Sequence, residues 1–209
     1  MLGADGLIDS IGGTCELELD SRATINDEGV QCPVWSGSLG CAQCEYTSSS
    51  KLPTGNSART LMFWMKMDST SNDATGIVGY GTTGSKKPFL ASLRNGKSLT
   101  WELWGPTISD SNIKPSTGIY THIALTYDGS GNGQFFKNGV ASPRTMNSNG
   151  DLITPDSGSV VVGGEVDNNE GMTGMIKDVR IYNRVLSAQE IGTITAGTVN
   201  MHMFSILPT

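Results

Sequence analysis

Short apolar segments separated by turn residues run from about residue 50 to residue 190. Residues 60–67 are nearly all apolar, a pattern that predicts a central strand covered on both faces. Residues 120–127 alternate instead, because Ile123, Leu125 and Tyr127 share one face at the period of two expected of a strand. Two further strands are predicted, at residues 160–162 and 175–182.

Two Asn-Gly pairs predict tight hairpins. Asn95-Gly96 joins strand-like residues 89–94 to residues 97–104, and Asn138-Gly139 follows another strand-like run. Asn-Gly suits the two positive φ positions of a type I′ turn, whose twist matches the twist of the flanking strands. We therefore expect two antiparallel hairpins at these positions.

One short helix is predicted near the C-terminal end. Ser187 and Glu190 have the spacing of a capping box, and Leu186 and Ile191 occupy the positions of a hydrophobic staple. The pattern favours one or two helical turns that end at Gly192. The apolar tail that follows, residues 193–209, either returns along the sheet as a strand or docks on a partner.

Length and composition favour a single all-β domain over the 209 residues. The chain has 27 glycines and only 16% charged residues, which is typical of many short strands joined by tight turns. Within it, residues 1–50 form a disulfide-rich wrap with an edge strand near residues 41–46. Residues 51–192 form the sandwich core, and residues 193–209 form the tail.

The charge balance excludes some partners. A net charge of −6 and a pI of about 4.8 argue against binding to nucleic acid, which needs a basic surface. No apolar run approaches the roughly 18–20 residues that span a bilayer, so no membrane insertion is expected. An acidic surface does permit a bound cation.

All four cysteines, Cys15, Cys32, Cys41 and Cys44, lie in the first quarter of the chain. An even number of cysteines in a loop-rich region favours two disulfides and an oxidising compartment. A zinc site is the main alternative, although the spacing contains one CxxC pair rather than two. The pairing of the cysteines does not follow from their spacing.

Four blocks of the sequence, residues 52–66, 120–129, 136–139 and 174–191, follow one another across about residues 42–192. In content and order they resemble laminin-G-like domains of the concanavalin-A-like lectin and glucanase superfamily. The resemblance implies a jelly roll of two curved antiparallel sheets. It further implies an extracellular, cell-surface or particle-surface location, a glycan or protein partner and, in many members, calcium.

Three aspartates are candidate calcium ligands. Asp178 is similar in position to a residue that often faces a cation in this family, and Asp9 is its expected partner across the sandwich edge. Asp128, in a glycine-rich loop, is the alternative ligand at the rim. Calcium takes six to eight oxygen ligands, which such carboxylates supply. Each could instead cap a turn or form a salt bridge.

Aromatic and acidic residues are the candidate ligand-binding groups. Exposed rings serve sugar-binding modules as stacking platforms, and the candidates here are Trp101, Trp104, Tyr80 and Trp35. Trp101 and Trp104 are three apart, so on one strand they would point to opposite faces. Trp64 is expected in the core because it lies within the apolar strand. Glu165 and Asp167 would add carboxylates beside the rings.

Catalysis is not expected. Residues 165–170 have the E-x-D-x-x-E spacing of glucanases that share this architecture, but glycines flank the segment and it is interpreted as a loop. His122 and His202 are too few for a histidine-based centre, and His122 is interpreted as a strand residue with a satisfied side chain.

The sequence thus predicts a binding or adhesion module that recognises glycans or an extracellular protein. The alternative is a structural role in a coat, filament or adhesin that assembles through residues 193–209. A glycoside hydrolase ranks third.

Overall fold

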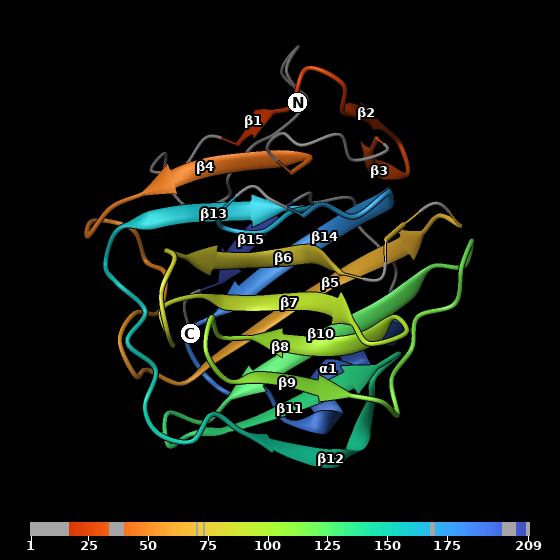
Figure 1. Ribbon diagram of the computed structural model, residues 1–209. Helices are drawn as coiled ribbons and strands as arrows, with labels where there is room; N and C mark the ends of the chain where they lie inside the picture. Colours follow the sequence, from red (N-terminus) through yellow and green to blue (C-terminus); the bar gives the residue numbers. More distant parts are fainter. Residues whose placement is uncertain are drawn as a thin grey trace.

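The computed structural model describes residues 17–33, 40–69, 71–72, 74–167, 170–197 and 204–207. These residues form two stacked antiparallel sheets with one helix, which confirms the predicted all-β jelly-roll sandwich. Figure 1 looks onto one sheet, with the other sheet and the helix behind it. Among the described residues, no helix combines the length and the apolar character needed to cross a membrane.

The seven-stranded sheet has the order β1-β4-β13-β6-β7-β8-β9. Its strands are β1 (Glu18–Leu19), β4 (Ala42–Tyr46), β13 (Gly158–Val162), β6 (Thr75–Gly81), β7 (Phe89–Arg94), β8 (Ser98–Glu102) and β9 (Thr107–Asp110). Strand β4 was predicted at the edge of the sheet. It lies one place further in, because the two residues of β1 pair with its outer side.

The eight-stranded sheet has the order β12-β11-β10-β5-β14-β3-β2, with β15 pairing separately to β14. Its strands are β12 (Val140–Asn147), β11 (Asn132–Lys137), β10 (Thr121–Tyr127), β5 (Arg59–Met67), β14 (Gly174–Tyr182), β3 (Gly29–Cys32), β2 (Thr24–Asn26) and β15 (Phe204–Leu207). The predicted central strand is β5, which pairs with β10 and β14.

The main hydrophobic core lies between the sheets, where alternate residues of each strand meet. Leu61, Phe63 and Met65 of β5 point inward, as do Ile123 and Leu125 of β10. Alternation on β5 leaves Trp64 on the outer face, half-buried, with its ring 5.2 Å from that of His122. The expectation that Trp64 belongs to the core is therefore wrong.

Both predicted hairpins are present. Asn138 and Gly139 have φ values of 51° and 80° between paired Lys137 and Val140, as a two-residue type I′ turn requires. The Asn95-Gly96 turn contains one residue more than predicted, because Lys97 also has a positive φ of 60° and Arg94 pairs with Ser98.

The predicted helix is α1 (Ala188–Ala196), and its capping box is formed by Ser187 and Glu190. The helix continues past Gly192, where it was expected to end, because Ile194 packs, together with Ile191, on the apolar cluster at the outer face of β5 and β10. Further along the chain, β15 pairs in parallel with β14, which is the first of the two alternatives for the tail.

His122 lies where α1 meets the sheet. Its ring is almost fully buried and forms a 3.0 Å hydrogen bond through Nδ1 with the hydroxyl of Thr195. Burial, followed by the nearby charge of Arg180, lowers the pKa of His122 to about 4. The side chain is therefore neutral and satisfied, as its position in a strand predicted.

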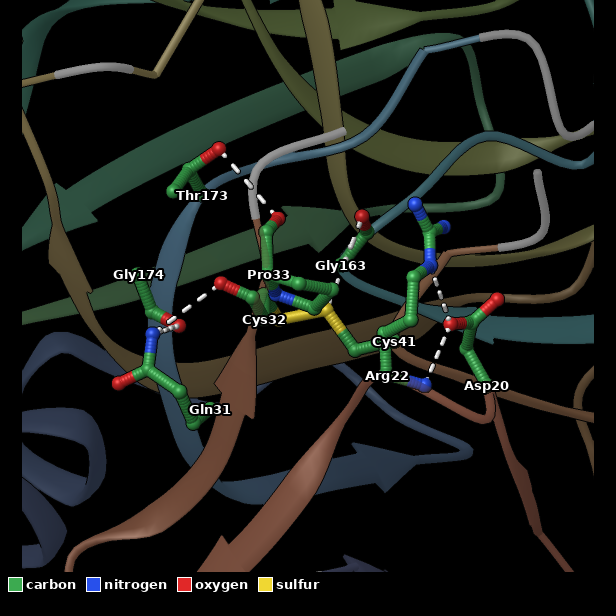
Figure 2. The surroundings of a disulfide bond; sticks show 9 residues. All are labelled: Asp20, Arg22, Gln31, Cys32, Pro33, Cys41, Gly163, Thr173 and Gly174. Carbon is green, nitrogen blue, oxygen red and sulfur yellow. Dashed lines mark hydrogen bonds and ion pairs between the residues drawn. A yellow bond between two sulfur atoms is a disulfide. The ribbon is translucent and has the colours of Figure 1, made fainter. Parts of the chain in front are cut away.

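One disulfide joins the two sheets. Cys32 ends β3 in the eight-stranded sheet and is bonded to Cys41, which precedes β4 in the seven-stranded sheet (Figure 2). Cys44 is also disulfide-bonded. Cys15 lies outside the described residues. The preference for disulfides over a zinc site is confirmed for the cysteines that the structure describes.

Arg59 is fully buried in the sandwich interior and uses all of its guanidinium nitrogens. Nη1 donates to the hydroxyls of Tyr80 and Thr154, at 3.0 and 3.1 Å. Nη2 and Nε donate to three carbonyls of the preceding loop, those of Thr54, Gly55 and Ser57. The guanidinium carbon also lies 5.4–5.9 Å from the ring centroids of Tyr80, Phe89 and Tyr127.

Replacing this buried arginine is expected to destabilise the fold. Arg59→Met should lower the free energy of unfolding by about 3 kcal/mol or more, because it leaves the hydroxyl and carbonyl acceptors without donors. Urea denaturation measures the loss. Arg184→Met, which removes an exposed ion pair with Glu190, is the control and should leave the free energy of unfolding nearly unchanged. Equal losses in both variants would contradict this account of Arg59.

Candidate functional site

A pocket of about 450 Å³ opens on the outer face of the seven-stranded sheet. On β7 and β8, Leu93 and Trp101 point into the core, so alternation directs Arg94 and Glu102 to the opposite face. The loop between β13 and β14 folds over this face. The residues that line the pocket are Arg94, Asn95, Glu102, Trp104, Thr107, Glu165, Asp167 and Glu170.

Arg94 holds three carboxylates together at the pocket. Its Nη2 lies 2.6 Å from Oε1 of Glu165, and its Nε lies 3.4 Å from Oε2 of Glu102. Its Nη1 forms a third ion pair with Glu170. Burial tends to lower the pKa of Arg94, but the three carboxylates outweigh burial and raise it. The guanidinium therefore stays charged and ties the loop to the sheet.

Glu165 is the most deeply placed carboxylate of the pocket, with 3% of its surface exposed. Val166 packs beside it on Leu90 and Val161, which anchors the loop to the sheet. Burial raises the pKa of Glu165 to about 7, and the charge of Arg94 only partly offsets this effect. Glu165 therefore changes protonation near neutral pH.

Trp104 forms one wall of the pocket from an unusual backbone conformation. Its φ is +50°, a region that bulky side chains rarely adopt. Glu102 holds this turn, because its Oε1 accepts the backbone N–H of Trp104 at 3.2 Å and the hydroxyl of Thr107 at 2.9 Å. The same carboxylate therefore positions both an aromatic ring and a hydroxyl.

Of the five predicted ligand residues that lie within the described ranges, the structure brings Trp104, Glu165 and Asp167 together in this pocket. The other two, Trp101 and Tyr80, are fully buried between the sheets and present no ring to the surface. Trp101 follows the inward alternation of β8, and Tyr80 follows that of β6. Neither can act as a stacking platform in this structure. Trp35 lies outside the described residues.

The two described calcium candidates are engaged by protein groups. Both oxygens of Asp178 bind Arg180, at 2.7 and 3.0 Å, and Asp178 occupies a bulge with a φ of +51°. Asp128 accepts hydrogen bonds from the backbone of Ser130 and Asn132 and from the Asn132 amide, as a turn cap does. Asp9 lies outside the described residues. Within the described ranges, no three acidic, His or Cys side chains are arranged to hold a metal.

Sequence reasoning missed Arg94 and Glu102, which organise the pocket. The available signal was alternation, because each is a charged residue at the end of a strand whose neighbours are buried. Glu170 was noticed only as the last residue of the E-x-D-x-x-E segment. Its ion pair with Arg94 joins two residues that are 76 positions apart in the chain.

The two-layer jelly roll and its polar pocket define a lectin-like sandwich domain. A family model described as the Concanavalin A-like lectin/glucanases superfamily matches residues 42–192. The chain belongs to this family, as the four sequence blocks predicted.

Solved structures share the fold at low sequence identity. Domain 4 of AbnA, a GH43 extracellular arabinanase from Geobacillus stearothermophilus in complex with arabinotriose, is 20% identical, with a TM-score of 0.56. That match covers 88% of this chain and 82% of the other. The binding domain of botulinum neurotoxin serotype D is 13% identical, with a TM-score of 0.64 and coverage of 88% and 46%.

A second structure of the serotype D ligand-binding domain contains N-acetylneuraminic acid. It is 15% identical to this chain, with a TM-score of 0.63 and coverage of 89% of this chain and 47% of the other. This chain therefore spans about half the length of the neurotoxin chains. At these identities the likeness establishes the fold.

The raised pKa of Glu165 should make stability depend on pH. Between its ordinary pKa of 4.5 and the folded value of about 7, the folded protein binds more protons than the unfolded chain, so this contribution to stability is lost as pH rises. Glu165→Gln is neutral throughout. Relative to wild type, the free energy of unfolding of this variant should rise by about 1–2 kcal/mol from pH 4.5 to pH 8, allowing for solvent screening.

Urea denaturation at several pH values measures this difference. Glu45→Gln, which removes an exposed carboxylate from the same sheet, is the matched control and should follow the wild-type profile. If Glu165→Gln followed the wild-type profile as well, the pKa of Glu165 would not be raised by folding.

Proposed function

We propose that this domain is an extracellular glycan-binding module and that the Arg94 pocket is its binding site. The observation that carries the proposal is the convergence of an aromatic wall, Trp104, with hydrogen-bonding groups from β7, β8 and β9 and from the loop between β13 and β14. Sugar rings present apolar faces and hydroxyl edges. Sites that combine an apolar wall with a few fixed polar groups suit such ligands.

The compared structures and the disulfides support the same proposal. Two structures with this fold contain saccharides, arabinotriose in one and N-acetylneuraminic acid in another. The arabinanase is extracellular by its description, and disulfides form in oxidising compartments. In this chain, residues 204–207 pair within their own sheet, which favours binding over assembly through the tail.

The charge of the pocket favours neutral or amino-bearing sugars over acidic ones. Glu102, Glu165, Asp167 and Glu170 line it together with one cation, Arg94, which already forms three ion pairs. A sugar carboxylate or sulfate would meet an excess of like charge. Hydroxyl or ammonium groups would instead donate to the carboxylate oxygens.

Binding without hydrolysis also fits the position of Arg94. Glu165 and Glu170 bind two nitrogens of the same guanidinium, so the cation lies between the two carboxylates that a glycosidase would need. A retaining mechanism requires free access of the glycosidic bond to both groups. We therefore propose no catalytic residue in this chain.

Trp104 should dominate glycan affinity. Trp104→Ala is expected to weaken binding about tenfold or more, because it removes the aromatic wall. Isothermal titration against the best ligand from a glycan array measures the change. Trp104→Phe, which keeps a ring, should retain most of the affinity, and Trp64→Phe on the opposite sheet should have no effect. Unchanged affinity in Trp104→Ala would place the site elsewhere.

The glycan array also tests charge selection and calcium. We expect neutral or amino-bearing glycans to bind and sialylated or sulfated ones to be rejected. Parallel arrays in calcium and in EDTA should agree if the pocket residues alone recognise the sugar. Binding lost in EDTA would require a metal site beyond the described contacts. No binding in either buffer would favour a protein partner.

A further inference from the structure

The carboxylate loop, defined here as described residues 163–167 and 170–173, supplies Glu165, Asp167 and Glu170 to the pocket. It begins at Gly163, directly after β13, and ends at β14. The position of the three carboxylates therefore depends on how the two ends of this loop are held. Both ends lie beside the disulfide between Cys32 and Cys41 (Figure 2).

Gly163 packs directly against the disulfide. Its φ is +75°, and a side chain at this position would overlap the sulfur of Cys41 and lie 2.6 Å from that of Cys32. The carbonyl oxygen of Gly163 is 4.0 Å from the Cys41 sulfur. One residue earlier, the carbonyl of Val162 accepts the backbone N–H of Cys41 at 2.8 Å. The loop thus begins in direct contact with the disulfide.

The next residue, Gly164, is enclosed by backbone on two sides. A side chain on Gly40, next to Cys41, would come within 2.8–2.9 Å of Gly164 backbone atoms. A side chain on Gly76 would overlap the Gly164 carbonyl. On that side, the N–H of Gly76 donates to the carbonyl of Glu170 at 3.3 Å. Three glycines therefore let the loop pass closely between Cys41 and β6.

The far end of the loop is attached to the residues around Cys32. The amide of Gln31 donates to the carbonyl of Gly174 at 3.2 Å, and the hydroxyl of Thr173 donates to the carbonyl of Pro33 at 3.5 Å. Figure 2 shows both contacts beside the disulfide. The bonded cysteines thus anchor the entry and the exit of one loop.

We propose that the Cys32–Cys41 disulfide is the positioning element of the pocket, and that opening it releases the carboxylate loop from Arg94. A bonded pair of sulfurs is about 2.0 Å apart, whereas two unbonded thiols separate to roughly the 3.5–4.0 Å of ordinary contacts. Gly163 packs against both sulfurs, so their separation displaces the start of the loop. Opening the bond therefore shifts the loop and couples the pocket to an oxidising environment.

This inference rests on the proposed function only for its effect on glycan binding. The geometry of the loop is measurable without a ligand, through the titration of Glu165. In the intact pocket its carboxyl is buried and has a pKa of about 7. When the loop leaves the sheet, the carboxyl becomes solvated and its pKa returns towards the ordinary value of 4.5.

The experiment compares two variants that alter the contact between Gly163 and the disulfide, one at the cysteines and one at the glycine. Cys32→Ser with Cys41→Ser removes the bond, and Gly163→Ala keeps the bond but fills the contact. Carbon-13 NMR of labelled glutamate follows the Glu165 titration, and calorimetry follows glycan binding. Matched controls are Cys15→Ser with Cys44→Ser, which removes the other cysteines, and Gly192→Ala, a glycine with open space around it.

We expect both test variants to lower the pKa of Glu165 by more than one unit and to weaken glycan binding at least tenfold. Both controls should keep the wild-type titration. Reduction of the Cys15→Ser/Cys44→Ser variant with a phosphine, followed by the same NMR signals, adds an arm that opens the Cys32–Cys41 bond without substituting either cysteine. Wild-type titration in both folded test variants would overturn the proposal. So would complete unfolding of the Cys15→Ser/Cys44→Ser variant on reduction, because the Cys32–Cys41 bond would then hold the whole fold.

If wild type binds no glycan, the proposed function fails while the titration still decides whether the disulfide positions the loop. If glycans bind but the titration and affinity survive in both test variants, the inference fails and the proposed function stands.

Discussion

The sandwich depends on a buried positive charge. Arg59 stays in the interior because two hydroxyls and three carbonyls accept its hydrogen bonds and three aromatic rings surround its guanidinium. A cation in such surroundings is tolerated only when its donors are satisfied. The loop before β5, the hydroxyl of Tyr80 and the residue Thr154 are therefore fixed relative to one another.

The same cluster supports the pocket on the other side of the sheet. The rings of Phe89 and Tyr127 touch Arg59 and also lie 5.9 and 5.6 Å from the ring of Trp101. Trp101 is the inward residue of β8, so its packing fixes the strand whose next residue, Glu102, faces outward into the pocket. The inner aromatic cluster thus positions the outer polar site through the alternation of a single strand.

Two cations organise the protein in different ways. Hydroxyl and carbonyl dipoles and aromatic rings stabilise the charge of Arg59 in the core. Arg94 instead forms ion pairs with carboxylates of β8 and of the carboxylate loop. The first arrangement fixes the fold, and the second leaves an excess of negative charge around an accessible cavity. A pocket with an excess of carboxylates and a buried carboxyl of raised pKa is a candidate functional site.

The sequence by itself determined the local elements of this protein. A continuous apolar run located β5, alternation located β10, Asn-Gly located the hairpins, and Ser187 with Glu190 located the start of α1. These features depend on neighbours within a few residues, so they can be read along the chain. The end of α1 was misjudged because packing of Ile191 and Ile194 on the sheet outweighed the cost of Gly192 within the helix.

Only the tertiary structure decided the site. It placed Trp101 and Tyr80 in the core and Trp104 in the pocket, because the face that a ring occupies depends on which sheet covers the strand. It also joined Arg94 to Glu165 and Glu170, across 71 and 76 residues, and set the Cys32–Cys41 bond beside Gly163. The contacts of Arg94 arise from the order in which β13, β6 and β7 pair in one sheet, and the disulfide arises from the stacking of the two sheets; no local pattern of residues records either.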